Sequence, residues 1–245
     1  MYTLKLLNSF VSICGEFMRR IKKINDTDWQ INFETTVLNT DYTDCFVKVE
    51  SSVLDCEGNY IVTGTGEGNV KLRDKNKLTY SAVVKNLLLW DCDNPNLYTV
   101  KTVLIKNDEI IDENITRIGF RTVEISATKG LLLNGKKMFI NSVCGHQDFG
   151  LTGLAVPENI AKYKMKLIKE MGANGYRTSY YQQTSAYLDA CDEMGILVMD
   201  EARWFESTKE SFEQLESLIK RDRNRPSVIF GSTSNNTKNP RIRLL

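Results

Sequence analysis

The first half of the chain alternates between apolar and polar residues. Residues 29–38 and 45–54 place an apolar side chain at nearly every second position, which is typical of strands that bury one face. Shorter runs of the same kind predict further strands at 60–63, 80–84, 97–105, 110–115 and 119–125. No helical stretch interrupts them. The pattern therefore predicts an antiparallel β-sandwich of the immunoglobulin-like kind over residues 25–126.

The second half has a different pattern, in which strands and amphipathic helices alternate. Helices are expected at 158–171, 184–194 and 209–222, between strands at 138–143, 175–178, 196–200 and 227–232. This alternation predicts a right-handed parallel sheet. No glycine-rich phosphate loop follows the first strand, which disfavours a dinucleotide-binding sheet. Residues 127–236 are therefore expected to form the first half of a (β/α)8 barrel, with its strands one to four.

The two ends of the chain lack these patterns. The apolar residues of segment 1–24 are interrupted by Asn8, Ser9 and Ser12, so we interpret it as an N-terminal stub rather than a signal peptide. Residues 237–245 are expected to form an irregular tail. Six cysteines lie apart from one another with no CxxC pair, which indicates small buried thiols in a reducing, cytoplasmic protein.

Composition excludes two classes of partner. Lys and Arg together number 32 against 31 Asp and Glu, which leaves no basic excess to hold a nucleic-acid backbone. No apolar run reaches the roughly 20 residues that cross a bilayer. The apolar content of 42% and charged content of 26% are ordinary for a folded globular protein.

Four segments carry a family resemblance. They are Leu89–Trp90 with the Asn94-Pro-Asn-Leu-Tyr98 run, residues 117–121 with 132–136, residues 174–183 with 191–201, and residues 222–236. In this order and spacing they resemble glycoside hydrolase family 2, the β-galactosidase and β-glucuronidase family. The resemblance covers residues 29–235. It implies a retaining glycosidase in which an immunoglobulin-like domain precedes a barrel, acting on a β-galactoside or a related glycoside. It implies no cofactor, although some members bind magnesium through ligands that this sequence does not clearly preserve.

The resemblance also implies the residues that contact the sugar. His146 and Asp148 follow the first barrel strand, and Tyr180 stands where the family has a histidine. Asn235 matches an asparagine that binds the 2-hydroxyl of the sugar in such enzymes. Arg177 either contacts substrate or forms an ion pair inside the barrel mouth. Asp200 and Glu201 are the candidate partners of that ion pair, and we interpret them as supporting carboxylates that do not touch the sugar.

Asn236 stands where the family has its acid/base glutamate. An amide cannot donate a proton at a useful pH, and general acid–base assistance is worth about 10²–10⁴ in rate. The chain ends nine residues later, before the position at which the resemblance places the glutamate nucleophile. We therefore expect a truncated chain with no intact catalytic residue, inactive alone.

Two alternatives stay open. The chain could be a carbohydrate-binding or partner-binding remnant, or one half of a split enzyme whose fifth to eighth strands lie on another polypeptide. A half-barrel would leave its first and fourth strands as open edges. We therefore expect it to self-associate or to recruit a partner that covers them.

Overall fold

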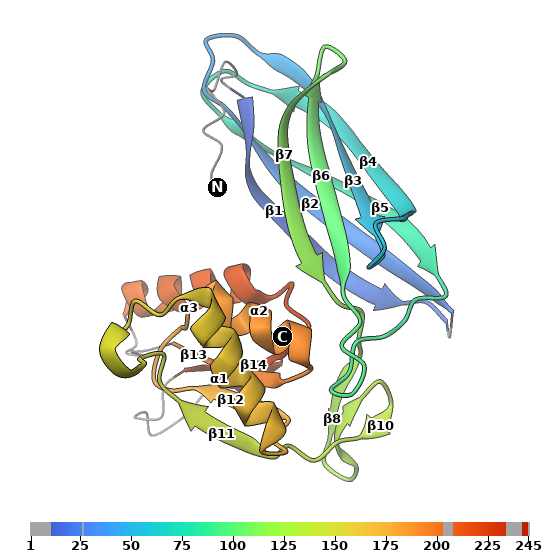
Figure 1. The fold of residues 1–245 in the computed structure, drawn as a ribbon. Coiled ribbons are helices and arrows are strands. Elements are labelled where there is room, and N and C mark those ends of the chain that lie inside the picture. The colour runs from blue at the N-terminus through green and yellow to red at the C-terminus, as the bar shows by residue number, and fades with distance from the viewer. Residues whose placement is uncertain (1–10, 26, 203–207, 234–241, 245) are drawn as a thin grey trace. The chain divides into compact units, whose positions relative to one another are not determined.

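The computed structural model describes residues 11–25, 27–202, 208–233 and 242–244. The chain divides into two compact units. The second unit includes a segment that falls, in sequence, between two stretches of the first. Residues 1–87 and 98–117 make up the first unit, and residues 88–97 and 118–245 make up the second. Figure 1 shows the strands of the first unit and the helices of the second.

The first unit is an antiparallel sandwich of two sheets in its described residues. One sheet has the order β1-β2-β5, with bounds Val11–Lys23, Asp28–Asn39 and Lys75–Lys85. The other has the order β4-β3-β6-β7, with bounds Tyr60–Val70, Cys45–Leu54, Tyr98–Lys106 and Glu109–Ile118. The predicted immunoglobulin-like sandwich is confirmed.

Alternation along the strands makes the sandwich core. In β3 every second side chain from Cys45 to Val53 is buried, because successive residues of a strand point to opposite faces. The same period holds at the start of β2, where Trp29, Ile31 and Phe33 are at most 3% exposed. Each buried apolar side chain of this size contributes about 1.5–3 kcal/mol, so the core follows from the pattern read in the sequence.

The N-terminal segment differs from its prediction as a stub. Residues 11–23 form β1, which pairs antiparallel with β2 from Val11 opposite Asn39 to Lys23 opposite Trp29, with two register irregularities. The strand was not predicted because its polar residues interrupt the alternation of apolar and polar positions. β1 lies at the edge of its sheet and has one neighbouring strand, and edge strands tolerate polar and charged side chains.

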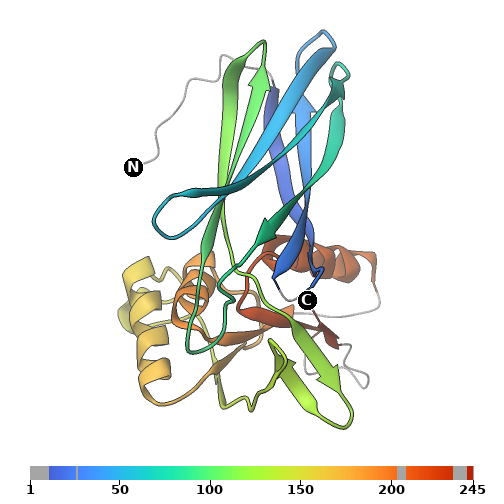
Figure 2. The ribbon, with the colours of Figure 1, turned by 90° about the vertical axis from the view of Figure 1, so that its right-hand side faces the viewer.

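The second unit is built on a parallel sheet, as expected for the partial TIM barrel that the sequence predicted. Its order is β11-β12-β13-β14, with bounds Ser142–Gly145, Gly175–Thr178, Leu197–Ala202 and Val228–Thr233. The crossing helices are α1 Glu158–Glu170, α2 Ser185–Met194 and α3 Lys209–Asp222. A short 3-10 turn, η1 Gly150–Thr152, follows β11. A small sheet of β8 Val123–Ser126, β9 Gly130–Leu133 and β10 Lys136–Lys137 precedes β11, as Figure 2 shows.

The segment 88–97 packs into this second unit. Trp90 is fully buried and its indole Nε1 donates to the Asp192 carbonyl of α2 at 2.8 Å. Arg121 donates from Nε to the Pro226 carbonyl at 2.5 Å and from Nη2 to that of Val228 at 2.6 Å. Burial lowers the pKa of Arg121 to about 10. The compact unit thus begins before the predicted boundary at residue 126, because these contacts hold residues 88–97 and 118–126 to it.

Two strand positions also differ from the predictions. The first barrel strand is β11 at 142–145 rather than 138–143, because the Asn174 side chain bonds the Asn141 amide and the Phe139 carbonyl instead. The tail expected to be irregular contains β15 Ile242–Leu244, which pairs antiparallel with β14. The predicted open edge of the fourth barrel strand is therefore covered, whereas β11 lies at the other edge of the sheet.

The prediction of small buried thiols holds for three of the described cysteines. Cys45, Cys92 and Cys191 are buried, whereas Cys56 and Cys144 are exposed. Cys144 is exposed because it lies on β11, the strand at the sheet edge. All five are free thiols.

Candidate functional site

The candidate site lies where the parallel strands of the second unit end. β11, β12 and β13 run in the same direction, so their carboxyl ends meet at one edge of the sheet. In a barrel this edge carries the active site. The segments that emerge there are residues 146–149 after β11 and residues 179–184 after β12, together with Glu201 near the end of β13.

Aromatic rings from two of these segments come together. The His146 ring centroid lies 5.4 Å from that of Tyr180 and 6.0 Å from that of Tyr181, with interplanar angles of 55° and 36°. His146 is exposed and Tyr180 is 51% exposed. These two predicted site residues, which are distant in sequence, thus form an accessible aromatic surface with a phenol and an imidazole at its edge.

Gln147 fixes the loop that presents His146. Its backbone amide donates to Tyr181 Oη at 3.1 Å, and its carbonyl accepts from Tyr187 Oη at 2.7 Å. Its side chain donates to the Leu154 carbonyl and accepts from the Thr184 amide, both at 2.8 Å. Gln147 is 7% exposed. Two of these bonds, to Tyr181 and Thr184, join the loop after β11 to the loop after β12, and the other two tie Gln147 to Leu154 and to Tyr187 of α2.

Lys164 of α1 supports the same loop from behind. Its ammonium donates to the His146 carbonyl and lies 5.5 Å from the Tyr187 ring centroid. Burial lowers the pKa of Lys164, and the negative charge of Asp148 partly opposes that effect. Asp148 itself is exposed. The predicted contact residue Asp148 is therefore accessible at this edge.

Arg177 and Glu201 form the ion pair that the sequence offered as one alternative. Arg177 Nη2 donates to both Glu201 carboxylate oxygens, at 3.0 and 3.1 Å, and Nε donates to one of them at 3.3 Å. The Glu201 side chain is fully buried and that of Arg177 is 21% exposed. Bonding to Glu201 raises the pKa of Arg177, and Cys144 adds to that effect. The charge of Arg177 is thus balanced within the site.

Asp200 faces α3 rather than Arg177. It contacts Thr178 of β12 and lies near Arg221 of α3. This arrangement follows from the alternation of side chains along β13, which sends Asp200 and Glu201 to opposite faces. Of the two predicted partners of Arg177, only Glu201 fulfils that role. Asn235 and Asn236 lie outside the described residues.

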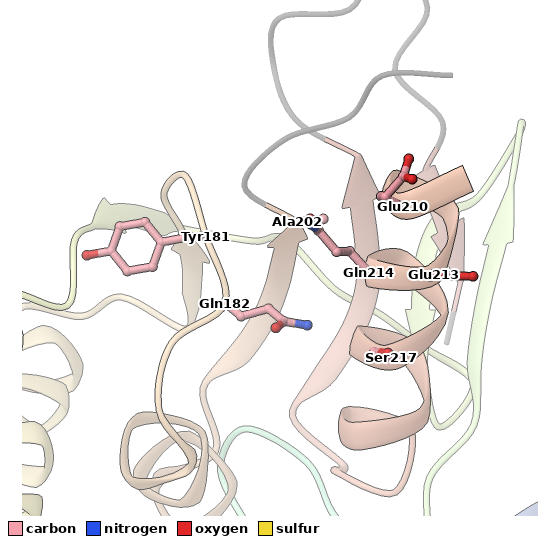
Figure 3. A pocket seen from close by; sticks show the side chains of 7 residues that line it. All are labelled: Tyr181, Gln182, Ala202, Glu210, Glu213, Gln214 and Ser217. Carbon is pink, nitrogen blue, oxygen red and sulfur yellow. The ribbon is translucent and has the colours of Figure 1, made fainter. Parts of the chain in front are cut away.

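A hollow lies beside the aromatic residues on the α3 side. It has a volume of about 480 Å³ and is lined by the loop after β12, the end of β13 and α3, through Tyr181, Gln182, Ala202, Glu210, Glu213, Gln214 and Ser217. Figure 3 shows Gln182 extending towards α3, whereas the Tyr181 ring points the other way. Tyr181 thus borders both the hollow and the His146 side. His146 and Arg177 do not line the hollow.

The described residues contain no group of three His, Cys, Asp or Glu side chains arranged to hold a metal ion. None of the helices in the described part of the chain is both long and apolar enough to cross a membrane.

Sequence reasoning missed the residues that hold the site together. Gln147 stands between two candidate contacts and Tyr181 follows a third, so their strand-end position was an available signal. Lys164 gave no signal, because it lies eighteen residues from the carbonyl that it bonds. Its role depends on how α1 packs against the loop.

Family models match most of the chain. The model of glycosyl hydrolases family 2 matches residues 18–121, and the model of the TIM barrel domain of the same family matches residues 123–207. The chain belongs to glycoside hydrolase family 2.

Curated relatives in this family are longer than the chain. A β-galactosidase of Bacteroides ovatus is 37% identical over 219 residues, which cover 84% of this chain and 26% of the relative. A β-galactosidase of Thermoanaerobacter pseudethanolicus is 31% identical, covering 86% of this chain and 28% of the relative. A putative β-glucuronidase of Formosa agariphila is 32% identical, covering 77% and 23%. The chain thus spans about a quarter of the length of these relatives.

Solved structures agree with the fold. A glycosyl hydrolase family 2 member from Bacteroides cellulosilyticus superposes with a TM-score of 0.84 at 32% identity, covering 94% of this chain and 32% of the other. A β-glycosidase from Bacteroides vulgatus gives a TM-score of 0.78 at 30% identity, covering 94% and 31%. The predicted family, with its immunoglobulin-like sandwich followed by a partial TIM barrel, is therefore confirmed.

Proposed function

We propose that the strand-end edge of the second unit binds a β-galactoside, and that this chain, with Asn236 at the acid/base position, binds the sugar without cleaving it. The observation that carries the proposal is the contact between His146 and Tyr180, whose ring centroids are 5.4 Å apart. Membership of glycoside hydrolase family 2 supports a glycoside as the ligand.

The chemistry of this edge suits a sugar. Sugars combine apolar C–H faces with hydroxyl groups, and ligand sites pair apolar or aromatic walls with a few oriented polar groups. The Tyr180 and Tyr181 phenols can donate or accept, and each imidazole nitrogen of His146 does one or the other when neutral. Gln147 and Lys164 hold the His146 loop by hydrogen bonds, which reduces the ordering cost of binding.

Charge favours a neutral sugar over a uronic acid. A glucuronide carries a carboxylate, which is best held by a guanidinium through two parallel hydrogen bonds. Among the described residues, the guanidinium at this edge is that of Arg177, and Glu201 engages it in this way. A β-galactoside requires no such cation, and several of the similar relatives are β-galactosidases.

The absence of turnover follows from Asn236. A retaining glycosidase, the mechanism that we propose for the ancestral site, uses two carboxyl groups roughly 5–5.5 Å apart, one as acid and one as nucleophile. The Asn236 amide cannot fill the first of these roles. Loss of general acid–base assistance alone lowers the rate by about 10²–10⁴.

The test is a titration of the full chain with isopropyl β-thiogalactoside, whose sulfur linkage resists cleavage, followed by NMR. We expect saturable shifts that Tyr180→Ala weakens at least several-fold. The matched control is Tyr163→Ala, because Tyr163 is a similarly exposed tyrosine, 53% exposed, on α1. Equal affinity of both variants, or no binding by the wild type, would contradict the proposed site. The matching thioglucuronide should bind more weakly.

Turnover is tested separately with p-nitrophenyl β-galactoside. The wild-type chain should release no nitrophenol above a blank without protein. Release that survives purification to homogeneity would overturn the proposal that the chain binds without cleaving.

A further inference from the structure

Acidic side chains gather behind β13, on the face opposite the Arg177–Glu201 pair. Asp200 of β13 and Asp222 at the end of α3 are both fully buried. Asp192 of α2 is 3% exposed, and Asp189 lies beside it. None of these residues is among those proposed to contact the sugar. Their role therefore depends on the hydrogen bonds and charges that they share with one another.

Asp200 has one satisfied oxygen and one unsatisfied oxygen. Its Oδ1 accepts from Thr178 Oγ1 at 3.1 Å and from the Glu201 amide at 3.0 Å. Its Oδ2 is buried and has no donor in the described part of the chain. The nearest guanidinium nitrogen, Arg221 Nη2, is 3.9 Å away, which is too far for a hydrogen bond. A buried carboxylate oxygen left in this way is costly, whereas a protonated oxygen would itself be a donor.

Asp222 is the acceptor that such a donor requires. Its Oδ2 accepts from Arg221 Nε at 2.7 Å and lies 2.6 Å from Nη2, and its Oδ1 accepts from Arg225 Nε at 3.2 Å. Two guanidinium groups therefore hold Asp222 as an anion. Arg221 Nη2 lies 2.6 Å from Asp222 Oδ2 and 3.9 Å from Asp200 Oδ2, so the two buried carboxyls flank one guanidinium nitrogen, and like charges this close favour a proton on one of them. That proton belongs on Asp200, because no guanidinium is hydrogen-bonded to it, whereas two are bonded to Asp222.

The charge balance of the cluster leads to the same assignment. Asp189, Asp192, Asp200 and Asp222 lie near three guanidiniums, those of Arg121, Arg221 and Arg225; Arg225 contacts both aspartates of α2, and the charge of Arg121 interacts with Asp192. Burial, and then the charge and hydrogen bond of Asp222, raise the pKa of Asp200 to about 7, against the opposing effects of Arg221 and Thr178. Burial also raises the pKa of Asp192.

We propose that Asp200 keeps its proton above the pH at which an ordinary aspartate has lost it and donates it to the Asp222 carboxylate, so that a carboxyl–carboxylate hydrogen bond ties β13 to α3. No bond is made or broken in this arrangement other than the transfer of a proton to or from water as the pH changes. The inference is independent of whether the neighbouring edge binds a sugar.

This proton makes Asp200 a positioning residue for the strand end. Asp200 and Thr178 both contact the Glu201 amide, at 3.0 and 2.9 Å, and Glu201 in turn holds Arg177. Loss of the proton would place two adjacent anions between β13 and α3. The second unit should therefore become less stable as this proton leaves.

The direction of the pH effect follows from the raised pKa. In the unfolded chain Asp200 titrates near its ordinary value of 3.8. Between about 4 and about 7 the folded state binds this proton and the unfolded state does not, so the stabilisation is complete below that range and is lost as the pH rises through about 7. One such group changes the folding equilibrium constant by up to about tenfold per pH unit.

The test compares urea unfolding of the full chain with that of its Asp200→Asn variant between pH 5 and pH 8. The asparagine amide can donate to Asp222 as the protonated carboxyl does but does not titrate. We expect the wild-type-to-variant ratio of folding constants to fall as pH rises. Asp93→Asn, which removes an exposed aspartate of the same unit, should show no such fall. A ratio that stays flat or rises with pH would overturn the proposal.

A second measurement covers the case in which Asp200→Asn does not fold. The side-chain carboxyl carbon of Asp200, assigned by NMR in the wild-type chain, should titrate with a midpoint well above that of the exposed Asp93. Titration of both groups in the same acidic range would show that Asp200 loses its proton like an ordinary aspartate, and the proposal would be wrong.

Discussion

The two units bury polar groups in different ways. Among the described residues of the sandwich, the fully buried polar side chains are neutral, namely Thr35, Asn39, Ser51 and Thr102, whereas Glu34, at 8% exposed, pairs with the exposed Lys77 at 3.2 Å. Those of the second unit include three carboxyls, Asp200, Glu201 and Asp222, beside the hydroxyls of Thr178 and Ser227. Both units have apolar cores, so the difference concerns the polar side chains that are buried with the apolar ones.

Buried neutral groups and buried charged groups differ in how their contribution to stability depends on pH. Neutral hydrogen bonds contribute about 0.5–1.5 kcal/mol each and do not depend on pH. Buried charges hold one another strongly but make stability depend on every partner and on protonation. The second unit therefore carries both the candidate site and the proposed pH linkage, whereas the sandwich, whose buried Glu34 pairs with an exposed lysine, should depend less on pH and on single charges.

The strongest way to break this contrast is to remove Arg225. Its guanidinium contacts Asp189 at 2.7 Å, Asp192 at 3.1 Å and Asp222 at 3.2 Å. Arg225→Ala leaves these carboxylates without that cation, and breaking a buried ion pair in this way costs about 3–5 kcal/mol. Amide hydrogen exchange should show this loss in the second unit and little change in the sandwich.

The control is Arg73→Ala in the sandwich. Arg73 is exposed and its guanidinium lies 4.4 Å from the Tyr42 ring centroid, a contact that adds little at an exposed site. We expect exchange rates in both units to stay near those of the wild type. Similar losses for Arg73→Ala and Arg225→Ala would mean that buried charge does not distinguish the units.

The sequence predicted the framework of both units because one face of each strand or helix is buried. The helix expected at 209–222 and the strand expected at 45–54 have those bounds in the structure. The edge strands β1 and β15 escaped prediction. An edge strand has neighbours on one side only, so its own pattern constrains it weakly, and β15 is defined by its pairing with β14.

For the site, the sequence predicted which residues lie at strand ends, but it did not predict which residues they contact. His146 and Tyr180 were both expected at the barrel mouth, and they do approach each other. That Glu201 rather than Asp200 pairs with Arg177 depends on which side chain faces inward at the end of β13. Two of the bonds of Gln147 form only because the loops after β11 and β12 meet. Such contacts are set by tertiary packing, which periodicity does not report.

A smaller change tests the neutral side of the contrast. Ser51 Oγ lies 2.6 Å from Tyr80 Oη and 2.5 Å from Thr102 Oγ1 inside the sandwich. Ser51→Ala removes one hydrogen-bond partner from the buried Thr102 hydroxyl and one from the half-buried Tyr80 hydroxyl, which keeps its contact with Thr35, and the change should cost about 1–3 kcal/mol. Urea unfolding at pH 5 and at pH 8 should give the same loss, since no group in this cluster titrates in that range.

The neighbouring serine provides the matched control. Ser52 faces the other side of β3, where its hydroxyl bonds Thr63 at 2.8 Å in an exposed setting. Water can replace that bond, so Ser52→Ala should cost clearly less than Ser51→Ala. A loss for Ser51→Ala that changes between the two pH values would assign a titrating partner to the sandwich core.

The smallest expected effect asks whether pH dependence in the second unit comes from buried charge alone. Thr208 caps α3, and its Oγ1 accepts from the Ser211 amide at 3.3 Å, whereas Thr184 precedes α2 and makes no such side-chain bond. Thr208→Ala should cost about 0.5–2 kcal/mol, as lost N-caps do, and Thr184→Ala clearly less. Both losses, measured by urea unfolding, should be equal at pH 5 and pH 8, because neither hydroxyl titrates. A Thr208→Ala loss that grows with pH would mean that the Asp200 proton affects the N-terminus of α3 as well as its last turn, which contains Asp222. The charge cluster would then influence the stability of the whole helix.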